Sequence, residues 1–515
     1  MNIKNIIAVL LIAIIGLALY AATIRGVAGN PQGSEIKGKL DQATKPLELS
    51  PERGRYVLVI SLAEDHSFAL NPTLAAAADP DIGYHDGRFY IYFGPGISIL
   101  ALPLYFLGKS MGIAQVATFF TISIFAVLNL IFIFLISRHI FKLPLWSALI
   151  GALIFGFAST SWSYAITLYQ HHVTTFIILS CFYAVWKYKQ GGRSRILWMS
   201  YVWIAFAYSI FIDYPNGILI APVMVYAFYS AFSFKNIVDK VSIKFDSIFL
   251  ITSIFFIGIC AVHGYYNYVN FGSWKTLSGG LVGIKEIRTK NLLKGSNTNA
   301  IDKEAEAKNV VSFFQEVHQP RGFAILLFSR DRGIFLFAPV FLFGFLGILS
   351  RLKHTETEGN MLMATVATHI FLYSSWGDPW GGWAFGPRYL IPAMSLLSIY
   401  AAYWLSLPKW GIARRIAGMV LIIFSSAIAL LGALTTNAVP PKVEADFLKM
   451  KYNFLHNYDY FMRGQSSSYV YNTYVKGILS LQEYFYIIWT IVLFIAFILL
   501  IVMPLFKRRH HEHHV

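Results

Sequence analysis

The segment "SPERGRYVLVI" places a carboxylate close to a guanidinium and a phenol. Tyr56, Ile60 and Ala63 recur at helical spacing, which indicates an amphipathic helix lying along a membrane surface. Glu52 falls near the start of this helix, one turn from Arg55 and Tyr56. A carboxylate there could act as a general base facing a cavity, or it could simply favour the positive end of the helix dipole. The spacing alone leaves both interpretations open.

More acidic residues follow in the same stretch. Glu64 and Asp65 stand beside His66 at the far end of the expected helix, where they could hold a metal or share a proton. A solvated charged helix end is the alternative. Asp81 and Asp86 lie around the segment "HDGR", in which Asp before Gly is common turn chemistry. The sequence therefore leaves open whether these carboxylates bind a divalent cation or form loop surface.

Two later segments carry groups suited to an anionic ligand. His171 and His172, in "LYQHHV", stand at the outer end of an apolar run and could bind phosphate, transfer a proton, or be interfacial histidines. Arg330 and Arg332, in "FSRDRGIFLFAP", precede another apolar run. A guanidinium can bind phosphate in a bidentate way. The alternative is a pair of arginines salt-bridged to Asp331.

The segment "GDPWGGWAFGPRYLIP" combines glycines and tryptophans with one arginine. Trp380 and Trp383 could belong to an interfacial aromatic belt. A belt requires neither the glycines nor an outer arginine, however. Glycines let the backbone approach a ligand closely, and Arg388 would meet an anion at the start of a helix. We therefore interpret this segment as one wall of a sugar-phosphate site.

The composition determines the class of protein that must position these residues. Of the 515 residues, 56% are hydrophobic and 13% are charged, whereas soluble domains carry about 25% charged residues. This indicates a polytopic membrane protein. The net charge of +16 is explained by Lys and Arg in short cytoplasmic loops, and nothing else in the chain supports nucleic-acid binding. Both cysteines lie in apolar runs, which excludes a disulfide in the outer loops.

A span needs roughly 20 apolar residues, so we predict about twelve membrane spans in an all-helical chain that forms a single transmembrane domain, residues 1–515. The predicted spans are 4–23, 116–137, 145–166, 172–188, 196–212, 215–233, 246–268, 333–350, 359–376, 389–406, 416–436 and 485–506. The shorter apolar segment 96–112 contains a proline, and we expect it to lie at the membrane surface.

This arrangement puts six short basic loops on the same side as both termini, which the positive-inside rule makes the cytoplasm. The outer face then carries the first loop, 24–115, with surface helices and the candidate catalytic motif. It also carries the loops 269–332 and 437–484, and we expect the latter to be a mobile lid over an acceptor groove. Asp213, at another outer turn, is expected to cap the following helix.

In this order the motifs resemble those of the GT-C superfamily of integral-membrane glycosyltransferases, in particular bacterial aminoarabinose transferases and protein O-mannosyltransferases. "ERGRYVLV" is similar to the family's "DExRYA" motif, and Glu52 takes the position of its catalytic Asp. "DIGYHDGRFYIYFGPG" (Asp81 to Gly96) resembles a second family element. "SRDRGIFLFAP" (Ser329 to Pro339) and "GPRYLIPAMSLL" (Gly386 to Leu397) resemble two late ones.

The resemblance implies a GT-C-like fold with outer juxtamembrane helices in a bacterial inner membrane. The donor would be a sugar on a polyprenyl phosphate, and the acceptor an envelope glycan, lipid or protein. Glu52 would take the proton of the acceptor hydroxyl, with inversion at the anomeric carbon. No cofactor is implied with certainty, although a divalent cation stays open. Residues expected at the donor phosphate and sugar are Arg55, Tyr56, Arg88, His171, His172, Arg330, Arg332, Trp380, Trp383 and Arg388.

Two other interpretations compete with this one. A transporter or flippase of a lipid-linked anion would also need spans and outer arginines. It does not account for a carboxylate-bearing surface helix after the first span, and the chain lacks the internal repeat found in many transporters. A non-catalytic relative that keeps the fold is the third interpretation.

Overall fold

The computed structural model describes residues 2–32, 35–36, 49–237, 240–283, 319–352, 356–409 and 411–505. Within these residues the protein is mostly helical, and seven helical segments are long and apolar enough to cross a membrane. They are α1 (Ile3–Thr23), α6 (Ala114–His139), α10 (Arg195–Ile212), α13 with α14 (Ser247–Thr252, Ile254–Phe271), η7 with α20 (Arg388–Leu390, Ile391–Ser406), α21 (Gly411–Leu434) and α24 with η9 (Leu481–Phe497, Ile498–Val502). The chain is a multi-pass integral membrane protein.

The other five predicted spans also fall on helices, but these helices are broken, short or polar. The broken ones are α7 with α8 (Leu145–Phe157, Ser161–Ala165), α11 with α12 (Asn216–Leu219, Ala221–Ser230) and α17 with α18 (Ile334–Phe337, Phe341–Arg351). The helices α9 (His171–Lys189) and α19 (Thr357–Ser374) are long enough but do not meet the hydropathy criterion for a span. The count of about twelve spans is therefore not confirmed, although the helices lie where they were predicted.

Short helices precede and connect these long ones. The predicted surface segment 96–112 forms α5 (Gly96–Ser110), with Pro103 inside the helix. The remaining helical elements are α3 (Ser50–Ile60), η2 (Ser61–Asp65), α4 (Pro72–Ala78), η3 (Ser278–Gly280), α16 (Gln319–Leu327), α22 (Lys442–Phe447), α23 (Phe454–Met462) and η8 (Tyr471–Val475). Residues 33–34 and 37–48 of the predicted first loop, and 284–318 of the loop 269–332, lie outside the described residues.

The expectation of an all-helical chain is wrong in one respect, because two small antiparallel sheets are present. One contains β1 (Ile82–His85) between β2 (Arg88–Ile91) and β5 (Val282–Gly283), and it joins two of the predicted outer loops. Its hairpin has Asp86 and Gly87 at its turn, as the "HDGR" pattern predicted, with both residues at positive φ. The other sheet is the hairpin of β3 (Phe232–Ile237) and β4 (Lys240–Phe245).

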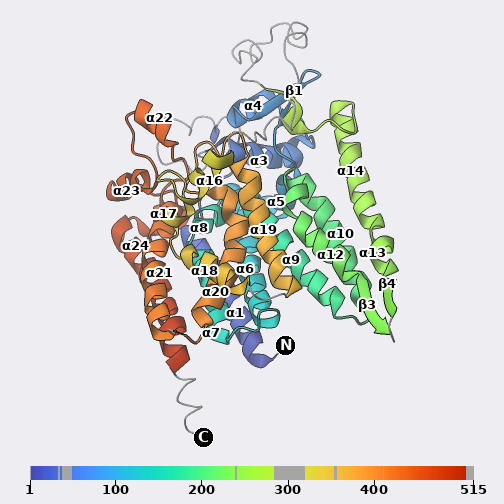
Figure 1. Ribbon diagram of the computed structural model, residues 1–515. Helices are drawn as coiled ribbons and strands as arrows, with labels where there is room; N and C mark the ends of the chain where they lie inside the picture. Colours follow the sequence, from blue (N-terminus) through green and yellow to red (C-terminus); the bar gives the residue numbers. More distant parts are fainter. Residues whose placement is uncertain are drawn as a thin grey trace.

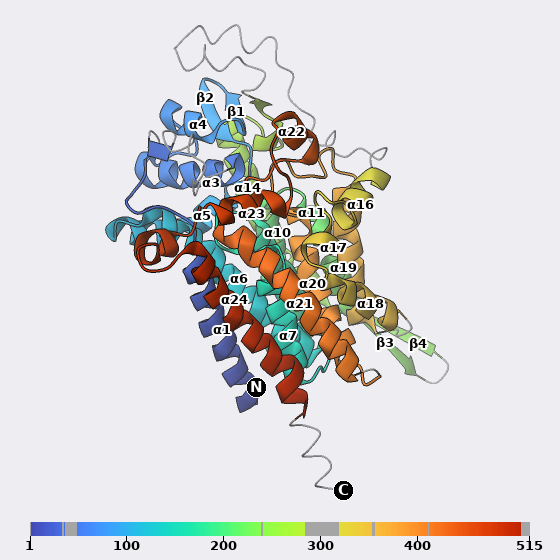
Figure 2. The ribbon, with the colours of Figure 1, turned by 90° about the vertical axis from the view of Figure 1, so that its left-hand side faces the viewer.

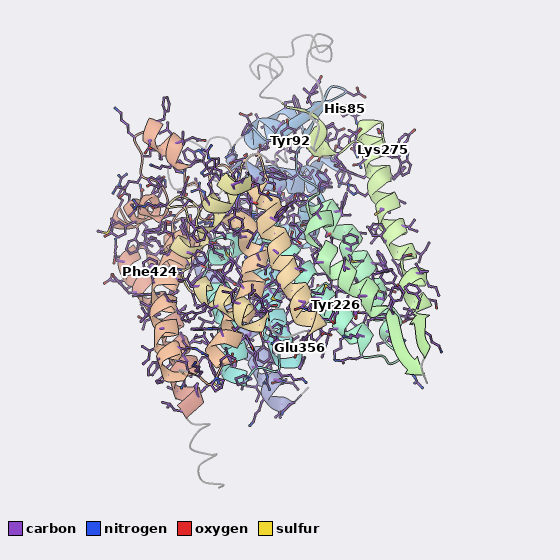
Figure 3. All side chains as sticks on the ribbon, viewed as in Figure 1. His85, Tyr92, Tyr226, Lys275, Glu356 and Phe424 are labelled. Atoms are coloured by element: carbon purple, nitrogen blue, oxygen red, sulfur yellow. The ribbon has the colours of Figure 1, made fainter. Side chains whose placement is uncertain are left out.

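The molecule has two distinct ends joined by the long helices (Figures 1 and 2). The helices α3, α4 and α22 and the β1 sheet gather at the upper end of Figure 1, and α1 begins at the lower end. In Figure 3, His85 and Lys275 lie toward the upper end, and Glu356 lies toward the lower one. An ion pair of 2.8 Å between Lys189 and Glu358 joins the last turn of α9 to the first turn of α19. Two of the predicted basic loops therefore meet at one end.

Close helix contacts support this scaffold. In α18, a Cβ atom at Gly344 would lie 2.7 Å from the carbonyl oxygen of Leu397 in α20, and one at Gly347 only 2.2 Å from that of Tyr400. Only glycine permits the two backbones to approach so closely, as is typical of helix pairs in membranes. The helix α20 follows η7, which begins at Arg388, so this packing also holds the end of the molecule that carries the candidate site.

Candidate functional site

Glu52 lies in the first turn of α3 and is fully buried. Its Oε1 accepts a hydrogen bond of 3.1 Å from the backbone N–H of Leu49, just before the helix. Its Oε2 accepts a hydrogen bond from the hydroxyl group of Thr167. The role at a helix start, which the sequence offered as an alternative, is thus observed. The catalytic role of Glu52 stays a prediction.

Arg55 lies one turn further along α3 and is 0% exposed. Its Nη1 donates a hydrogen bond of 2.9 Å to the carbonyl oxygen of Pro51. Its guanidinium carbon lies 4.4 Å from the centre of the Phe93 ring and 6.0 Å from that of Tyr169. The buried charge therefore rests on aromatic faces.

The short connection between α8 and α9 links three parts of the site. Thr167 donates to Glu52, and Tyr169 places its ring near Arg55. Gln170 then donates a hydrogen bond of 3.1 Å from Nε2 to Oδ2 of Asp213, which follows the end of α10. One tight stretch of backbone therefore positions side chains toward both α3 and α10.

Arg388 approaches the same tyrosine from the start of η7. Its guanidinium carbon lies 5.5 Å from the ring centres of both Tyr169 and Tyr389. The ring of His171 stacks on Tyr169 with centres 5.9 Å apart, and it meets Tyr389 edge-on at 6.4 Å. We refer to Arg55, Tyr169, His171, Arg388 and Tyr389 as the arginine–tyrosine cluster.

Gly381 shows why the segment "GDPWGGWAFGPRYLIP" needs glycine. The residue has φ of +72°, and a Cβ atom there would lie 3.0 Å from Nε of Arg388 and 3.1 Å from a ring carbon of Tyr389. Any other residue would be strained in this conformation and would crowd the guanidinium. The glycine thus allows the backbone to pass directly beside the arginine.

Several polar atoms of the cluster are buried without a hydrogen-bond partner in the described part of the chain. They are Nε and Nη2 of Arg55, Nε and Nη1 of Arg388, the hydroxyl of Tyr169 and Nε2 of His171. Buried polar groups in proteins are normally paired, because an unpaired one costs free energy. Four unpaired guanidinium nitrogens, from two arginines that both lie near the ring of Tyr169, form an arrangement that an anion with several acceptor oxygens would satisfy.

The electrostatics of α3 and Asp213 agree with this geometry. Burial lowers the pKa of Arg55 to about 10, and Asp213 is the charge that most opposes this effect. Burial likewise raises the pKa of Asp213 above its ordinary value, against the influence of Arg55, the hydrogen bond from Gln170, and Arg388. Both arginines thus interact with the Asp213 carboxylate, and Asp81 also acts on Arg55.

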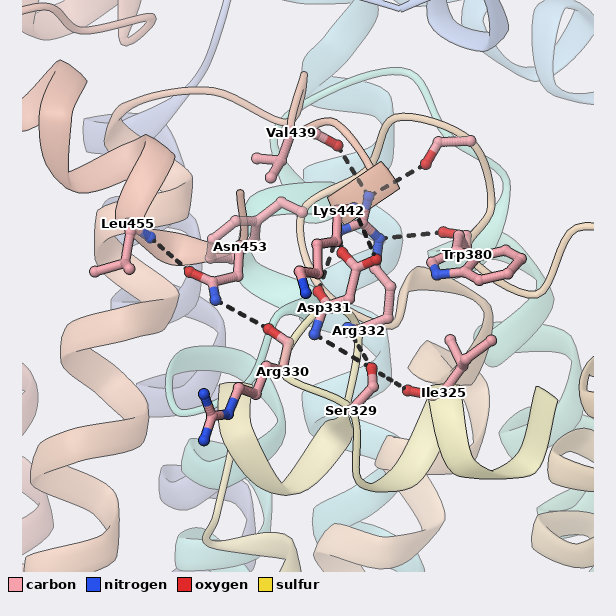
Figure 4. A network of polar contacts seen from close by, with 12 residues as sticks. Ile325, Ser329, Arg330, Asp331, Arg332, Trp380, Val439, Lys442, Asn453 and Leu455 are labelled. Carbon is pink, nitrogen blue, oxygen red and sulfur yellow. Dashed lines mark hydrogen bonds and ion pairs between the residues drawn. The ribbon is translucent and has the colours of Figure 1, made fainter. Parts of the chain in front are cut away.

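Arg332 has a different environment, although it is equally buried (0% exposed). Its five N–H groups make hydrogen bonds of 2.8–3.2 Å to carbonyl oxygens and to one carboxylate (Figure 4). The acceptors are the backbone carbonyls of Trp380, Gly382, Val439 and Asp331, and Oδ1 of Asp331. Each donor is used, so Arg332 ties three outer segments together and has none left for a ligand.

The neighbouring candidates also have other partners. Arg330 is exposed, and its carbonyl oxygen accepts a 2.9 Å hydrogen bond from Asn453 while its guanidinium points away from the network in Figure 4. The indole of Trp383 donates to Glu444 in α22 at 2.5 Å. The ring of Trp380 lies 5.2 Å from the guanidinium of Arg321. The structure therefore surrounds Arg388 with tyrosines instead of these tryptophans.

Two other predicted ligands face the protein core. His172 is buried, with Nε2 2.9 Å from the carbonyl oxygen of Ser161 and Nδ1 3.3 Å from the Asn129 amide. Tyr56 lies edge-on to Tyr105 and Phe119 and is not part of the arginine–tyrosine cluster. Of the two histidines, the structure places only His171 beside Arg388.

The secondary acidic residues are spread over the outer end. Glu64 pairs with Lys109 at 2.6 Å, Asp65 accepts a 3.0 Å bond from Asn71, and Asp81 accepts one from Ser50. Asp86 and Arg88 are exposed in the β1–β2 hairpin. Within the described ranges, no three His, Cys, Asp or Glu side chains come together in a way that could hold a metal ion.

An open cavity of about 620 Å³ lies elsewhere, beside the first turn of α24. Its lining includes Arg463, Gln465, Lys476 and Gln482. Its lining lies in the segment 437–484, and it includes none of the individually predicted site residues, so the cavity is separate from the arginine–tyrosine cluster.

Sequence reasoning missed Tyr169, Gln170 and Tyr389 and assigned Asp213 to helix capping. The residue that precedes α11 is Pro215, with no side-chain cap, so the expected capping role of Asp213 is wrong. The signal for Tyr169 and Gln170 was present, because both belong to the polar run "LYQHHV" at an outer helix end. Only tertiary structure places these residues opposite Arg55 and Arg388.

No protein-family model and no curated protein matches the chain in sequence. Among solved structures, the chain is similar to archaeal oligosaccharyltransferase AglB from Archaeoglobus fulgidus, determined in complex with an inhibitory peptide and a dolichol-phosphate. The TM-score is 0.50 at 15% identity, over 87% of this chain and 57% of that chain. The apo form of the A. fulgidus oligosaccharyltransferase gives 0.46 at 14% identity, over 86% and 57%.

ArnT from Cupriavidus metallidurans, in the apo state, also gives a TM-score of 0.46 at 14% identity, over 96% of this chain and 77% of that chain. The chain spans just over half the length of the archaeal oligosaccharyltransferase. At such low identity these likenesses concern the fold, and the predicted GT-C-like fold is confirmed.

Proposed function

We propose that the chain is a membrane glycosyltransferase that transfers a sugar from a polyprenyl-phosphate donor to an acceptor. The acceptor would be an envelope glycan, lipid or protein at the outer face of a bacterial cytoplasmic membrane. The observation that carries the proposal is the set of unpaired guanidinium nitrogens of Arg55 and Arg388, which both lie near the ring of Tyr169. The GT-C-like fold supports it, and AglB was determined with a dolichol-phosphate.

The phosphate of the donor would bind Arg55 and Arg388. During transfer the bond between the anomeric carbon and the phosphate oxygen breaks, and the polyprenyl phosphate takes the bonding electrons. This leaving group gains negative charge, so preorganised guanidinium groups stabilise the transition state more than the ground state. Because these two arginines keep N–H groups unpaired, no internal hydrogen bond has to break when the phosphate arrives.

Glu52 is the proposed general base. The acceptor hydroxyl attacks the anomeric carbon from the face opposite the phosphate and gives its proton to Glu52, with inversion of configuration. Thr167 and the N–H of Leu49 already donate to this carboxylate. These contacts fix its orientation, and the acceptor would have to share Oε2 with Thr167.

The proposal includes the membrane topology. All twelve predicted spans would cross, with the shorter and more polar helices enclosed by the apolar ones, and both termini would be cytoplasmic. The predicted basic loops after α9 and before α19, which the Lys189–Glu358 ion pair brings together, support this orientation. The segment 437–484 would close over the acceptor, anchored where Asp331 accepts from the backbone N–H of Lys442 at 3.0 Å.

The decisive experiment supplies purified full-length protein with a panel of polyprenyl-phosphate sugars and a crude envelope acceptor extract, and measures release of free polyprenyl phosphate. Glu52→Gln and Arg388→Ala run beside the wild type, with Lys275→Ala, at an exposed position of the same end, as control. We expect each of the first two variants to lose roughly 100-fold or more in release.

The outcomes separate the competing functions. Release that is unaffected by Glu52→Gln moves the base to another residue and leaves the transferase standing. No release from any donor, in protein that still binds the lipid, contradicts the transferase and favours a transporter of lipid-linked anions or a non-catalytic relative.

A further inference from the structure

A pair of hydrogen-bond acceptors lies beside the arginine–tyrosine cluster. Asp213 follows the end of α10, and its Oδ2 accepts from Nε2 of Gln170 at 3.1 Å. A carboxylate can only accept, so the amide nitrogen of Gln170 must face Asp213 and its Oε1 must face away. That Oε1 is buried without a hydrogen-bond partner in the described part of the chain.

The Asp213 carboxylate is not engaged in holding the helix that follows it. Its neighbour α11 begins after Pro215 without a side-chain cap. Asp213 stays partly accessible, as do Gln170, Arg388 and Tyr389, whereas Arg55, Tyr169 and His171 are buried. These four partly accessible residues therefore form the side of the site that a ligand could reach.

Donors and acceptors of hydrogen bonds are thus segregated within a small region. Arg55 and Arg388 offer only N–H donors, which suits phosphate oxygens. Asp213 and Gln170 offer acceptors, which suit the hydroxyl groups of a sugar. Arg55 and Arg388 are also the charged groups that act most strongly on Asp213, which places all three in one electrostatic environment.

We infer that Asp213 and Gln170 form a subsite for the hydroxyl groups of the transferred sugar, adjacent to the phosphate site of Arg55 and Arg388. This inference rests on the proposed function. It specifies a donor sugar with free hydroxyl groups next to the phosphate linkage.

The test compares two lipids with the full-length protein in bilayer nanodiscs. One is polyprenyl phosphate without a sugar, and the other is the tightest binder among polyprenyl-phosphate glucose, mannose and galactose. The subsite predicts opposite effects of Asp213→Ala on the two Kd values. The glycosyl lipid loses about 10- to 100-fold in affinity, because hydroxyl bonds to a charged acceptor are lost. The sugar-free lipid binds several-fold more tightly, since a negative charge near its phosphate is removed.

A second variant guards against a folding defect. Gln170→Leu removes the acceptor Oε1 without changing the charge, so it should weaken only the glycosyl lipid. Asp446→Ala, on the exposed face of α22, is the control and should change neither affinity.

Each outcome decides the question. Asp213→Ala changes of equal sign for the two lipids, or no change for the glycosyl lipid, overturn the subsite while the phosphate site stands. A loss of turnover above 1000-fold at unchanged affinity for the glycosyl lipid also overturns it, since that would make Asp213 a proton-transfer group. Failure of wild-type protein to bind either lipid would reject the proposed function and the subsite together.

Discussion

Two groups of arginines around the candidate site differ in how they are paired, although Arg332 and Arg55 are both fully buried and Arg388 is only partly accessible. All five N–H groups of Arg332 are bonded to carbonyls and to Asp331, and the residue joins the segments around Trp380 and Val439. Arg55 makes one such bond, and Arg388 keeps two buried nitrogens unpaired. The first arginine is saturated by the protein, whereas the other two keep capacity for a ligand.

This difference shows that residue type and position in a motif do not determine function. Arg332 and Arg388 both lie in outer motifs that resemble those of one enzyme family. A buried charge with complete hydrogen bonding stabilises the fold, because removing it leaves its partners unpaired. A buried charge without complete hydrogen bonding destabilises the unliganded fold and is characteristic of binding sites.

The largest expected effect is on turnover when one of the two arginines with unpaired nitrogens is replaced. Arg55→Ala and Arg388→Ala should each lower release of polyprenyl phosphate by about 100- to 1000-fold. The double variant should fall little further, because the two guanidinium groups act on one phosphate. Initial rates with a saturating donor measure this. Fully additive losses would mean that the two residues act on different groups.

The next effect is on stability, and it should have opposite signs in the two regions. Arg332→Ala leaves four carbonyls and a carboxylate without partners, at a cost of about 3–5 kcal/mol. Arg388→Ala removes a guanidinium with two unpaired nitrogens and should keep or raise the Tm. Thermal unfolding in the same detergent compares them. A drop of equal size in both variants would contradict the assignment of Arg388 as a ligand-binding residue.

A smaller effect concerns the hydrogen bond that links Trp383, near the segment bound by Arg332, to the segment 437–484. Glu444→Gln weakens the bond from the Trp383 indole, which is a charge-assisted hydrogen bond at an exposed position. We expect faster proteolysis within α22, with a loss of up to a few-fold in turnover. Limited proteolysis with and without donor measures it, and protection unchanged by donor plus acceptor would count against a lid.

The smallest effect concerns the ion pair of Lys109 and Glu64, which lies outside both groups of arginines and serves as a baseline. The hydrogen bond from Lys109 lowers the pKa of Glu64, and Tyr105 contributes in the same direction. The resulting stability is present above the unfolded pKa of about 4.3 and is lost as the pH falls through the folded value. Lys109→Ala should therefore cost about 1 kcal/mol or less at pH 7 and nothing in strong acid. A Tm difference that persists in acid would point to lost packing instead.

The sequence predicted the positions of the helices well and their status as spans less well. Apolar runs of span length indicate helices, because lipid requires every backbone polar group to be bonded within the segment. The break between α17 and α18 falls at Pro339, which has no backbone N–H, and α7 ends at Phe157 before α8 begins at Ser161. The small β1 sheet was missed because β5 contributes only two residues from a distant loop.

The site was predictable in part for a related reason. Arg55, His171 and Arg388 came from motifs whose residue types suit phosphate, and the structure brings them together around Tyr169. The neighbouring Asp331 offered a salt-bridged alternative for Arg332, but only the folded chain shows that all donors of Arg332 are used and that two nitrogens of Arg388 are not. Nor could spacing show that Asp213 lies near Arg55, which it follows by 158 residues in the chain.

The most direct test of the central claim measures binding of polyprenyl phosphate to wild type, Arg388→Ala and Arg330→Ala in nanodiscs. Arg330 is an outer arginine from a family-like motif whose side chain is exposed, which makes it the matched comparison. We predict that Arg388→Ala loses about 100-fold in affinity while Arg330→Ala stays within a few-fold of wild type. Equal affinities of wild type and Arg388→Ala would contradict the account.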